Sequence, residues 1–472
     1  MRKVIKIFNE NQKNSANYLD AESLAKSWGD IFINLEVSQE INHQFSEFIY
    51  RTSPQNASLE LIKLLDSVKN SEELLILPLC MKDEVAGYIA SREKKDTRIL
   101  NWHIVYNNFV RYSFLESNRN LATNIPQDTN LWIQQLIEKY SKKIILDSLN
   151  SLSIKIHLLG ESIIDEYIYC EALGKVSKDP LIAFRISEKV QQFGGILAAA
   201  KHVEKLTGGC VLFSEIDSAS LESLTPRISE NIDTHLVTSE RTSQVTKTRY
   251  VDISSNVRVF ETYSMNTNYS SENKFTEMIT KYFKENYVQE LFIIDFGHGL
   301  INSEVIELLM NSNVKISVNT QSNAGNRGFN SISKYTGAER IFINGVELEL
   351  EARRKTINRE ELILEIAPRL KCKEMFVTQG AAGLLFWNES DGVMSVPGFA
   401  PSIVDRVGAG DVLLTTVSAL RANGVPIDIA CFYGNISGGI AVGSIGNSFS
   451  ISKSILLSNA IEILDRVDNI SE

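Results

Sequence analysis

The sequence predicts an α/β fold from residue 151 to the end of the chain, with a parallel-type central sheet and helices on both of its faces. Short apolar segments alternate there with helix-like segments, which is the pattern of parallel strands joined by helices. Residues 1–150 differ, because they are rich in Asn, Ser, Lys and Glu and contain few strand-like segments. A chain of 472 residues is also too long for one typical core. We therefore expect two domains, residues 1–150 and residues 151–472.

The predicted strands of the second domain are short runs dominated by Val, Ile, Leu and Phe. They span residues 154–159, 211–214, 291–296, 314–318, 340–343 and 374–378. Helix-like stretches lie between them, with residues 196–206 and 304–310 as the clearest examples.

The first domain, residues 1–150, is predicted to be mixed and mostly helical. In its clearest helix, residues 131–140, the side chains of Leu131, Leu136, Ile137 and Tyr140 share one face. Residues 74–79 are its clearest strand. Its sequence contains no Gly-rich phosphate loop, no D-x-D-x-T motif and no convincing cluster of metal ligands. We therefore assign no function to this domain.

Composition and charge narrow the class of protein. A formal net charge of −10 does not favour nucleic acid as a partner. The longest apolar runs are strand-sized, and no small-residue cleavage site follows the N-terminus as in a secretory signal. The five cysteines are scattered without a C-x-x-C pair, which is typical of reduced thiols rather than of disulfides or a zinc site. We expect a cytoplasmic protein that binds neither nucleic acid nor a membrane.

The sharpest local pattern runs from Asp405 to Asp411 and reads Asp-Arg-Val-Gly-Ala-Gly-Asp, just before an apolar helix. Gly408 and Gly410 around Ala409 let successive backbone N–H groups turn toward one point, where the beginning of the helix adds the positive end of its dipole. This arrangement suits a phosphoryl group in transfer, and Asp411 in the first turn would take a proton from a hydroxyl. Taken alone, the segment also fits a tight turn with an acidic helix start.

The context decides between these interpretations. Residues 405–411 resemble the D-T/R-x-G-A-G-D signature of the ribokinase/PfkB family of carbohydrate kinases. Other segments resemble family motifs in the same order, namely residues 156–167 (first strand and sugar loop), 174–182 (start of the lid), 193–198 (Gly-Gly turn), 246–250 (second lid strand), 294–300 (strand and loop before a helix) and 344–347 (N-x-x-E). The likeness covers about residues 154–466 and looks closest to the kinase domain of heptose-7-phosphate kinase/adenylyltransferases of lipopolysaccharide synthesis.

The resemblance implies a ribokinase-like domain with a small β lid that phosphorylates a sugar or sugar phosphate with ATP. Asp411 would be the catalytic base, and Gly408, Ala409 and Gly410 would form the anion hole. A heptose phosphate destined for a surface polysaccharide is one candidate substrate. The family also pairs through its lid, so a homodimer of this kind is an expectation for the chain.

The resemblance further implies residues that bind the sugar. Asp165 would hydrogen-bond sugar hydroxyls beside the backbone of Gly194 and Gly195, although it also fits a solvated loop acid. Lys247 and Arg249 on a lid strand would suit a phosphate group on the sugar. The same two residues equally fit exposed charges on a strand.

For the nucleotide side, the resemblance implies that Asn344 and Glu347 organise Mg²⁺ and its water shell near the phosphates. A helix cap with an acidic first turn is the alternative interpretation of this pair. ATP would lie between the loop of Thr378 and Gly380 and the helix near Asn435. Asp405 is expected to bind a monovalent cation, K⁺, together with nearby carbonyl groups.

Two positions depart from the family pattern. Ala198 stands where the family has an Asn that contacts the sugar, and Ala cannot replace the donors and acceptor of an amide. Asn319 ends a strand that in the family continues into an Asp-Pro-Lys-like stretch, so an acid and a base are absent. The H-x-G-H pair of the adenylyltransferases is also absent from the sequence. These departures leave the sugar open.

These motifs and departures bear on three functions. The favoured one is an ATP-dependent carbohydrate kinase. The second is a kinase-fold binding or regulatory protein with weak or lost catalysis, which Ala198 and Asn319 favour and the intact Asp411 opposes. A dinucleotide-dependent oxidoreductase is disfavoured, since no G-x-G-x-x-G follows the first strand of the α/β domain.

Overall fold

The computed structural model describes residues 3–8, 31–36, 74–75, 127–239, 245–253, 257–265, 272–356, 358–400, 405–443, 446–447 and 450–471. The chain divides into two compact units, Met1–Ser117 and Asn118–Glu472. In the first unit, three strands form a parallel sheet in the order β2-β1-β3. They are β1 (Lys3–Phe8), β2 (Ile31–Glu36) and β3 (Leu74–Leu75). The sequence predicts that residues 1–150 are mostly helical. Apart from these three strands and residues 127–150, which include α6, that prediction lies outside the described residues.

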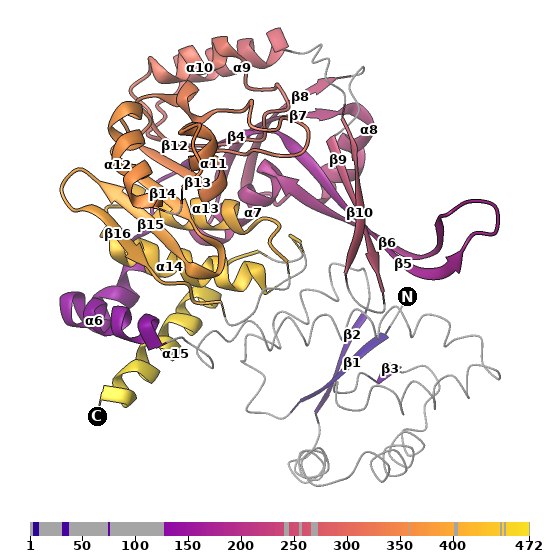
Figure 1. The fold of residues 1–472 in the computed structure, drawn as a ribbon, viewed down its shortest axis with the longest axis horizontal. Coiled ribbons are helices and arrows are strands. Elements are labelled where there is room, and N and C mark those ends of the chain that lie inside the picture. Colours follow the sequence, from indigo (N-terminus) through magenta and orange to yellow (C-terminus); the bar gives the residue numbers. More distant parts are fainter. Residues whose placement is uncertain are drawn as a thin grey trace. The chain divides into compact units, whose positions relative to one another are not determined.

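The boundary between the units differs from the one predicted at residue 150. Helix α6 (Gln127–Asp147) belongs to the second unit, because Ile133, Leu136 and Ile145 lie in the same buried cluster as the core of that unit. Its contacts with α15 (Lys453–Ser471) include the ion pair of Lys142 with Asp465 at 3.0 Å. Figure 1 shows the two helices side by side.

The predicted apolar face of this helix is wrong in one position. Leu131 is 58% exposed, whereas Ile133, which was not assigned to the face, is fully buried. The helix also breaks at Ser141, whose φ of 62° is not helical. A single helical period therefore does not describe both halves of α6.

The central sheet of the described residues has nine strands in the order β16-β15-β14-β13-β12-β11-β4-β7-β8. All pairs from β14 to β8 are parallel, and β15 and β16 join antiparallel at one edge. The strands are β4 (Ile156–Gly160), β7 (Cys210–Asp217), β8 (Ile232–Ser239), β11 (Glu290–Asp295), β12 (Lys315–Thr320), β13 (Arg340–Asn344), β14 (Glu374–Thr378), β15 (Leu384–Asn388) and β16 (Gly392–Val396).

Helices cover both faces of this sheet, as the sequence predicts (Figure 1). They are α7 (Ile196–Thr207), α8 (Ser218–Leu224), α9 (Glu272–Glu285), α10 (Ser303–Met310), α11 (Gly345–Glu351), α12 (Arg359–Leu370), α13 (Ala409–Ala422) and α14 (Ile427–Val442), together with α6 and α15. Short 3₁₀ turns are η5 (Ser148–Ser151), η6 (Thr225–Arg227), η7 (Ile332–Tyr335) and η8 (Gly380–Ala382). Each strand and helix that the sequence predicts in this unit is present, within a few residues at its ends.

The strands are apolar on both sides because each face of the sheet has its own buried cluster. In β11, Phe292 and Ile294 point into the cluster that contains α7, α13 and α14, whereas Leu291 and Ile293 point into the cluster that contains α9, α10 and α12. This alternation explains why the strands read as continuous hydrophobic runs rather than as an alternating pattern.

A second sheet, which we call the lid sheet, consists of strands in the order β10-β9-β5-β6. They are β5 (Ser162–Lys175), β6 (Ile182–Gly195), β9 (Val245–Asp252) and β10 (Arg258–Ser264). β5 follows β4 directly, and β6 leads back into α7, so the sheet projects from the carboxyl ends of the central strands (Figure 1). This sheet confirms the small β lid that the sequence predicts.

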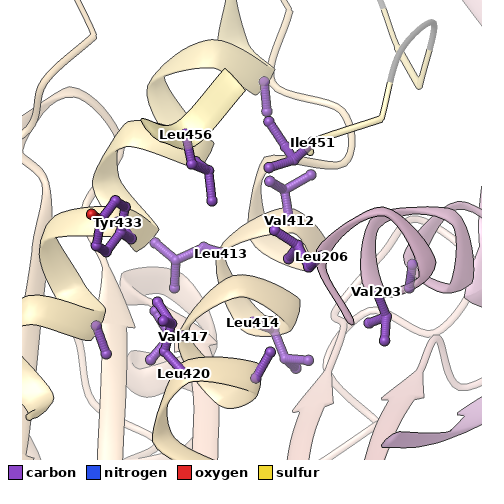
Figure 2. Packing of buried hydrophobic residues seen from close by; sticks show 14 of the residues in the cluster. Val203, Leu206, Val412, Leu413, Leu414, Val417, Leu420, Tyr433, Ile451 and Leu456 are labelled. Carbon is purple, nitrogen blue, oxygen red and sulfur yellow. The ribbon is translucent and has the colours of Figure 1, made fainter. Parts of the chain in front are cut away.

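Helix α13 lies at the centre of one buried cluster. Its side chains Val412, Leu413, Leu414, Val417 and Leu420 are buried, and they pack among residues of α7, α14 and α15 (Figure 2). Close packing on several sides fixes the position of the helix N-terminus. The helix therefore holds the residues of the Gly-Ala-Gly-Asp segment on a rigid support.

Candidate active site

A cavity of about 840 Å³ lies at the carboxyl ends of the central strands, between β11–β14, α13, α14 and the lid sheet. This is the end at which open parallel sheets bind their ligands. The residues predicted for the site that line the cavity are Asp165, Gly195, Lys247, Arg249, Asn344, Glu347, Thr378, Gly380, Gly408, Ala409, Gly410, Asp411 and Asn435. Two predicted residues, Gly194 and Asp405, do not line the cavity themselves. Gly194 lies against Asp165, and Asp405 accepts from the N–H group of Val407, which lines the cavity.

Asp411 lies in the first turn of α13 and is 8% exposed. Within the described part of the chain its carboxylate makes no hydrogen bond, although it faces the cavity. Burial raises the pKa of the Asp411 carboxyl to about 7; Lys247 opposes the rise, whereas the charges of Asp165 and Glu347 add to it. A carboxylate without partners, with a pKa close to neutrality, can accept and release a proton at physiological pH.

The backbone before Asp411 provides hydrogen-bond donors. Gly408 precedes α13 with a φ of 77°, and no side chain caps the helix. The first N–H groups of a helix have no partner within it, so those of Ala409 and Gly410 remain available to an anion. A β-carbon at Gly410 would meet nothing within 4 Å, which leaves space for a ligand against the backbone. At Gly408 it would instead collide with Asn447.

Lys247 enters the cavity from lid strand β9 and is 6% exposed. Its ammonium lies 4.9 Å from the ring centre of Phe296 and 5.7 Å from that of Tyr263. Among the described residues it forms no hydrogen bond or ion pair. Burial lowers the pKa of Lys247, which the charges of Asp165 and Asp411 partly offset. A buried ammonium that faces a cavity favours an anionic ligand.

Asp165 and Arg249, both predicted to bind substrate, contact each other instead of lying apart. The guanidinium of Arg249 donates to Asp165 at 2.5 Å and to Glu261 at 3.2 Å. The side-chain amide of Asn447 donates to the second Asp165 oxygen at 3.1 Å. The Arg249 side chain is 6% exposed, so it is not a charge on an open strand.

The Gly-Gly turn supports this acid. A β-carbon at Gly194 would lie 2.2 Å from an oxygen of Asp165, and one at Gly195 would lie 2.4 Å from the carbonyl oxygen of Glu161. Only glycine allows both close approaches. The turn therefore positions Asp165 at the cavity wall.

Asn344 and Glu347 form a capping box at the beginning of α11. The Asn344 side chain accepts from the N–H groups of Val346 and Glu347, both at 2.9 Å. The Glu347 carboxylate accepts from the N–H groups of Asn344 at 2.8 Å and Ser322 at 2.9 Å. Burial raises its pKa. Both residues also line the cavity, so the cap and the predicted role are not exclusive.

The donor set suits a cation that keeps its own water shell. Within the described residues no cluster of three or more His, Cys, Asp or Glu is arranged to hold a metal ion. Glu347 uses two of the roughly four lone-pair positions of a carboxylate, which leaves two for coordinated water. Mg²⁺ binds in this way, with few protein carboxylates and several waters and phosphate oxygens. The residues fit an indirect magnesium site.

The opposite end of the cavity consists of backbone and small side chains. Thr378 ends β14 and Gly380 follows it, and Asn435 on α14 donates to the carbonyl of Pro397 at 2.9 Å. Gly438 on the same helix also lines the cavity, where a β-carbon would meet nothing within 4 Å. Gly434, by contrast, lies against Val417 of α13. Gly434 therefore allows close packing of α14 on α13, whereas Gly438 leaves space beside the cavity.

Asp405 does not present a free oxygen. Its carboxylate accepts from the N–H groups of Val407 at 2.9 Å and Gly446 at 3.0 Å, from the Tyr167 hydroxyl at 3.4 Å and from the guanidinium of Arg258. These four donors fill the lone-pair positions of a carboxylate. The residues present therefore do not fit the monovalent cation that the sequence predicts here.

Comparison with known proteins also indicates a carbohydrate kinase domain. Residues 222–454 match the model of the pfkB family carbohydrate kinases. The chain contains a pfkB-family carbohydrate kinase domain. In sequence, this kinase domain is similar to bifunctional protein HldE of Haemophilus influenzae (strain PittEE), 22% identical over 315 residues that make up 65% of this chain and 63% of that protein. An uncharacterized sugar kinase of Buchnera aphidicola is 24% identical over 315 residues, 65% of this chain and 95% of the relative.

Solved structures show the same fold. Phosphofructokinase-2 of Escherichia coli, in a complex with potassium, superposes with a TM-score of 0.54 at 15% identity and covers 67% of this chain and 99% of its own. Ribokinase of Thermotoga maritima gives a TM-score of 0.51 at 17% identity and covers 65% of this chain and 99% of its own. The predicted ribokinase-like fold is confirmed. Because the chain spans 63% of the length of HldE, the activity of that whole protein is not transferred here.

The two departures of the kinase domain occupy different environments. Ala198 is 3% exposed in the first turn of α7 and does not line the cavity. Asn319 does line it, and its amide donates to the carbonyl of Phe342 at 2.8 Å across the sheet. Gln321, Ser322 and Asn323 continue the same wall. This part of the cavity is therefore lined by neutral polar groups.

Several charged or polar residues of the kinase domain reach the cavity without having been predicted. They are Arg258, Glu261, Arg359, Arg406 and Asn447. Arg406 belongs to the signature segment, residues 405–411, so its place in the sequence was enough to find it as a cavity residue. Arg258 and Asn447 come from the lid and from the segment after α14, and only the folded chain brings them to Asp405 and Asp165.

Proposed function

We propose that this chain transfers the γ-phosphoryl group of ATP to a hydroxyl group of a sugar or sugar phosphate. The observation that carries the proposal is the buried Asp411 at the N-terminus of α13, which has no hydrogen-bond partner among the described residues and lies beside the first N–H groups of that helix. Membership of the kinase domain in the pfkB family supports the class of reaction.

In this mechanism the hydroxyl oxygen of the substrate attacks the γ-phosphorus of ATP. The Asp411 carboxylate accepts the proton that this hydroxyl loses. The N–H groups of the Gly408–Gly410 turn stabilise the negative charge on the phosphoryl oxygens, aided by the helix dipole. A pKa of about 7 suits a base that must be ionised before the reaction and protonated after it. Arg406, exposed at the cavity edge, adds a positive charge toward the phosphates.

Mg²⁺ would neutralise part of the charge on the ATP phosphates. Glu347 would accept hydrogen bonds from its water shell, while Asn344 fixes Glu347 through the capping box. The adenosine part would lie toward Thr378, Gly380 and Asn435. We do not include K⁺ in this proposal, because the carboxylate of Asp405 is already fully bonded.

For the substrate we propose an anionic sugar, such as a heptose phosphate used for a surface polysaccharide. The free ammonium of Lys247 supports an anionic group near Asp411. Arg249 is less suited to meet it, because Asp165 and Glu261 already hold its guanidinium. The resemblance of the sequence motifs to heptose-7-phosphate kinases supports the choice of this sugar.

The test is the release of ADP across a panel of neutral sugars and sugar phosphates, including a heptose 7-phosphate. We expect turnover with at least one sugar phosphate and little with its unphosphorylated counterpart. If only neutral sugars are turned over, the proposed anionic substrate is wrong and the proposed kinase activity stands. Absence of ADP release with every sugar would contradict the proposed function.

A second candidate is a kinase-fold protein that binds nucleotide or sugar without turnover. The paired state of Asp165 and the neutral wall around Asn319 favour it, because both reduce the groups available to a substrate. Calorimetry distinguishes the two functions. Binding of ATP without turnover of any sugar would support the regulatory protein.

We also propose that two chains pair through the lid sheet. Its strands and the turn between β5 and β6 expose large apolar side chains, namely Leu173, Val176, Leu181, Ile182, Ile186, Val259 and Phe260. Exposed apolar side chains gathered on one sheet favour association. Light scattering of the wild type and of an Ile186→Lys variant tests this: we expect a dimer and a monomer, respectively.

The remaining expectations concern the location of the protein. Cys170, Cys210, Cys372 and Cys431 are free and buried. Such thiols support the proposal of a cytoplasmic protein. No helix within the described ranges combines the length and apolar character of a membrane span.

A further inference from the structure

The carboxylate of Asp405 is 4% exposed and lies directly behind the Gly-Ala-Gly turn. Two of its four donors are the backbone N–H groups of Val407 and Gly446, and the third is the hydroxyl of the fully buried Tyr167 at the base of lid strand β5. The fourth donor is the guanidinium of Arg258. Arg258 alone comes from the outer lid strand β10 and is partly exposed.

A monovalent cation beside this carboxylate would need one of its oxygen lone pairs. All positions are filled, so the cation would have to displace a donor. Loss of the N–H contact from Val407 or from Gly446 would require the backbone to rearrange at the 405–408 loop or at Gly446. A cation placed beside Arg258 would also be repelled by the guanidinium at short range. Of the two side-chain donors, the Tyr167 hydroxyl is fully buried and uncharged, whereas Arg258 is partly exposed and carries the charge, so removal of Arg258 leaves the carboxylate both open and without its counter-charge.

We propose that the guanidinium of Arg258 takes the place of a monovalent cation at Asp405, so that this chain needs no K⁺. The guanidinium neutralises a buried carboxylate that also holds the N–H group of Val407, next to Gly408. It is a positioning residue, because it acts on the anion hole through the loop and not on the reacting atoms. It also ties the shape of that loop to the lid strand that carries it.

The first experiment uses the unmodified full chain. Turnover and thermal unfolding are measured in KCl, NaCl and choline chloride at equal ionic strength. We expect kcat to agree within about twofold among the three salts, and the unfolding temperatures to coincide. A severalfold fall of kcat in choline, or a stabilisation specific to K⁺, would overturn the proposal. The turnover arm rests on the proposed kinase function, whereas the thermal arm is independent of it.

The second experiment removes the guanidinium. In Arg258→Gln we expect kcat in choline chloride to fall about tenfold, in line with the loss of one charge-assisted hydrogen bond. KCl should restore part of this loss and raise the unfolding temperature of the variant, an effect that the wild type lacks. Arg258→Lys, which retains a positive charge, should keep most of the activity in choline.

Arg185→Ala is the matched control, because Arg185 forms an exposed ion pair with Glu171 on the same sheet. It should show neither the loss nor the response to K⁺. An Arg258→Gln variant with full, cation-independent activity would overturn the proposal. So would a loss that neither K⁺ nor the Lys substitution reverses. If no sugar is turned over at all, the proposed function fails, and the thermal comparison between wild type and Arg258→Gln still decides the inference.

Discussion

The two sides of the cavity hold their carboxylates in opposite ways. On the α13 side, Asp411 lies on a helix whose apolar side chains are packed in a buried cluster, and it has no hydrogen-bond partner in the part of the chain that the structure describes. Where the lid meets this side, Asp165 of β5 and Asp405 of the loop before α13 are each bonded to an arginine of the lid sheet and to further donors. The difference separates two tasks. The unpartnered acid is free to exchange a proton, while the partnered acids fix the shape of the lid and loops.

The largest expected effect comes from the α13 side. Asp411→Asn removes the base without changing the size of the side chain, and kcat should fall by about 10²–10⁴, the range for loss of a general base. Release of ADP measures it. Asp428→Asn is the control, since Asp428 also lies in the first turn of a helix but pairs with Lys139 away from the cavity. Undiminished turnover of Asp411→Asn would erase the contrast between the two sides.

On the lid side, Lys247→Met should raise the KM for an anionic sugar by about tenfold to a hundredfold, because it removes the one free ammonium facing the cavity among the described residues. The KM for ATP should change little. Lys189→Met serves as control, since Lys189 pairs with Glu166 at 2.8 Å and is largely exposed on the same sheet. An unchanged sugar KM would place the anionic group elsewhere.

The pH dependence of kcat/KM should report the α13 side directly. Asp411 must be ionised to act as base, so the rate should rise with pH below about 7 and level off above it. Lys247 lowers the pKa of Asp411, so Lys247→Met should move this limb to higher pH. A limb near pH 4 in the wild type would show that burial does not control the acid.

Whereas kcat/KM should rise with pH, the stability of the fold should fall as Asp411 ionises. The folded-state pKa of Asp411, about 7, lies above the ordinary 3.8, so its ionisation destabilises the fold as pH rises between these values. Asp411→Asn removes this effect and should raise the unfolding temperature at pH 8, with a gain bounded by about 4 kcal/mol, and should change it little at pH 4. Thermal unfolding at the two pH values measures it. Equal changes in unfolding temperature at pH 4 and pH 8 would mean that the fold does not raise the pKa of Asp411.

The smallest effect tests the support of the α13 side. Gly434→Ala should cost about 1–3 kcal/mol, because the new methyl group would lie 2.5 Å from Val417 on α13. Gly438→Ala, one turn further along α14, meets no atom within 4 Å and should leave stability nearly unchanged. Chemical denaturation compares the two. Similar losses in both variants would argue against close packing as the cause.

The sequence predicts the α13 side well and the lid side poorly, for a physical reason. The strands and the Gly-Ala-Gly-Asp turn follow from local composition, because burial on both faces and a helix start leave clear patterns over a few residues. The ion pairs of Asp165 and Asp405 join residues far apart in the chain, Asp165 with Arg249 and Asn447, and Asp405 with Arg258. No local pattern encodes such pairs, so a cation was expected where an arginine lies.

The domain boundary is the other feature that the sequence misplaced. A change in composition near residue 150 suggested a boundary there, yet α6 packs with the second unit through residues such as Ile133 and Leu136. Composition reports how a segment is built and not which partner it packs against. The contact between α6 and α15 joins the two ends of the unit and has no local signature.

That contact also sets the order in which the second unit can be completed during synthesis. Helix α6 leaves the ribosome first among the helices described here, and α15, its partner, leaves last. Until residues 453–471 have been made, α6 lacks this partner. The contact between the two helices can therefore form only after the rest of the second unit has been made, and a chain that stops before residue 453 keeps an open apolar seam that quality-control proteases and chaperones recognise.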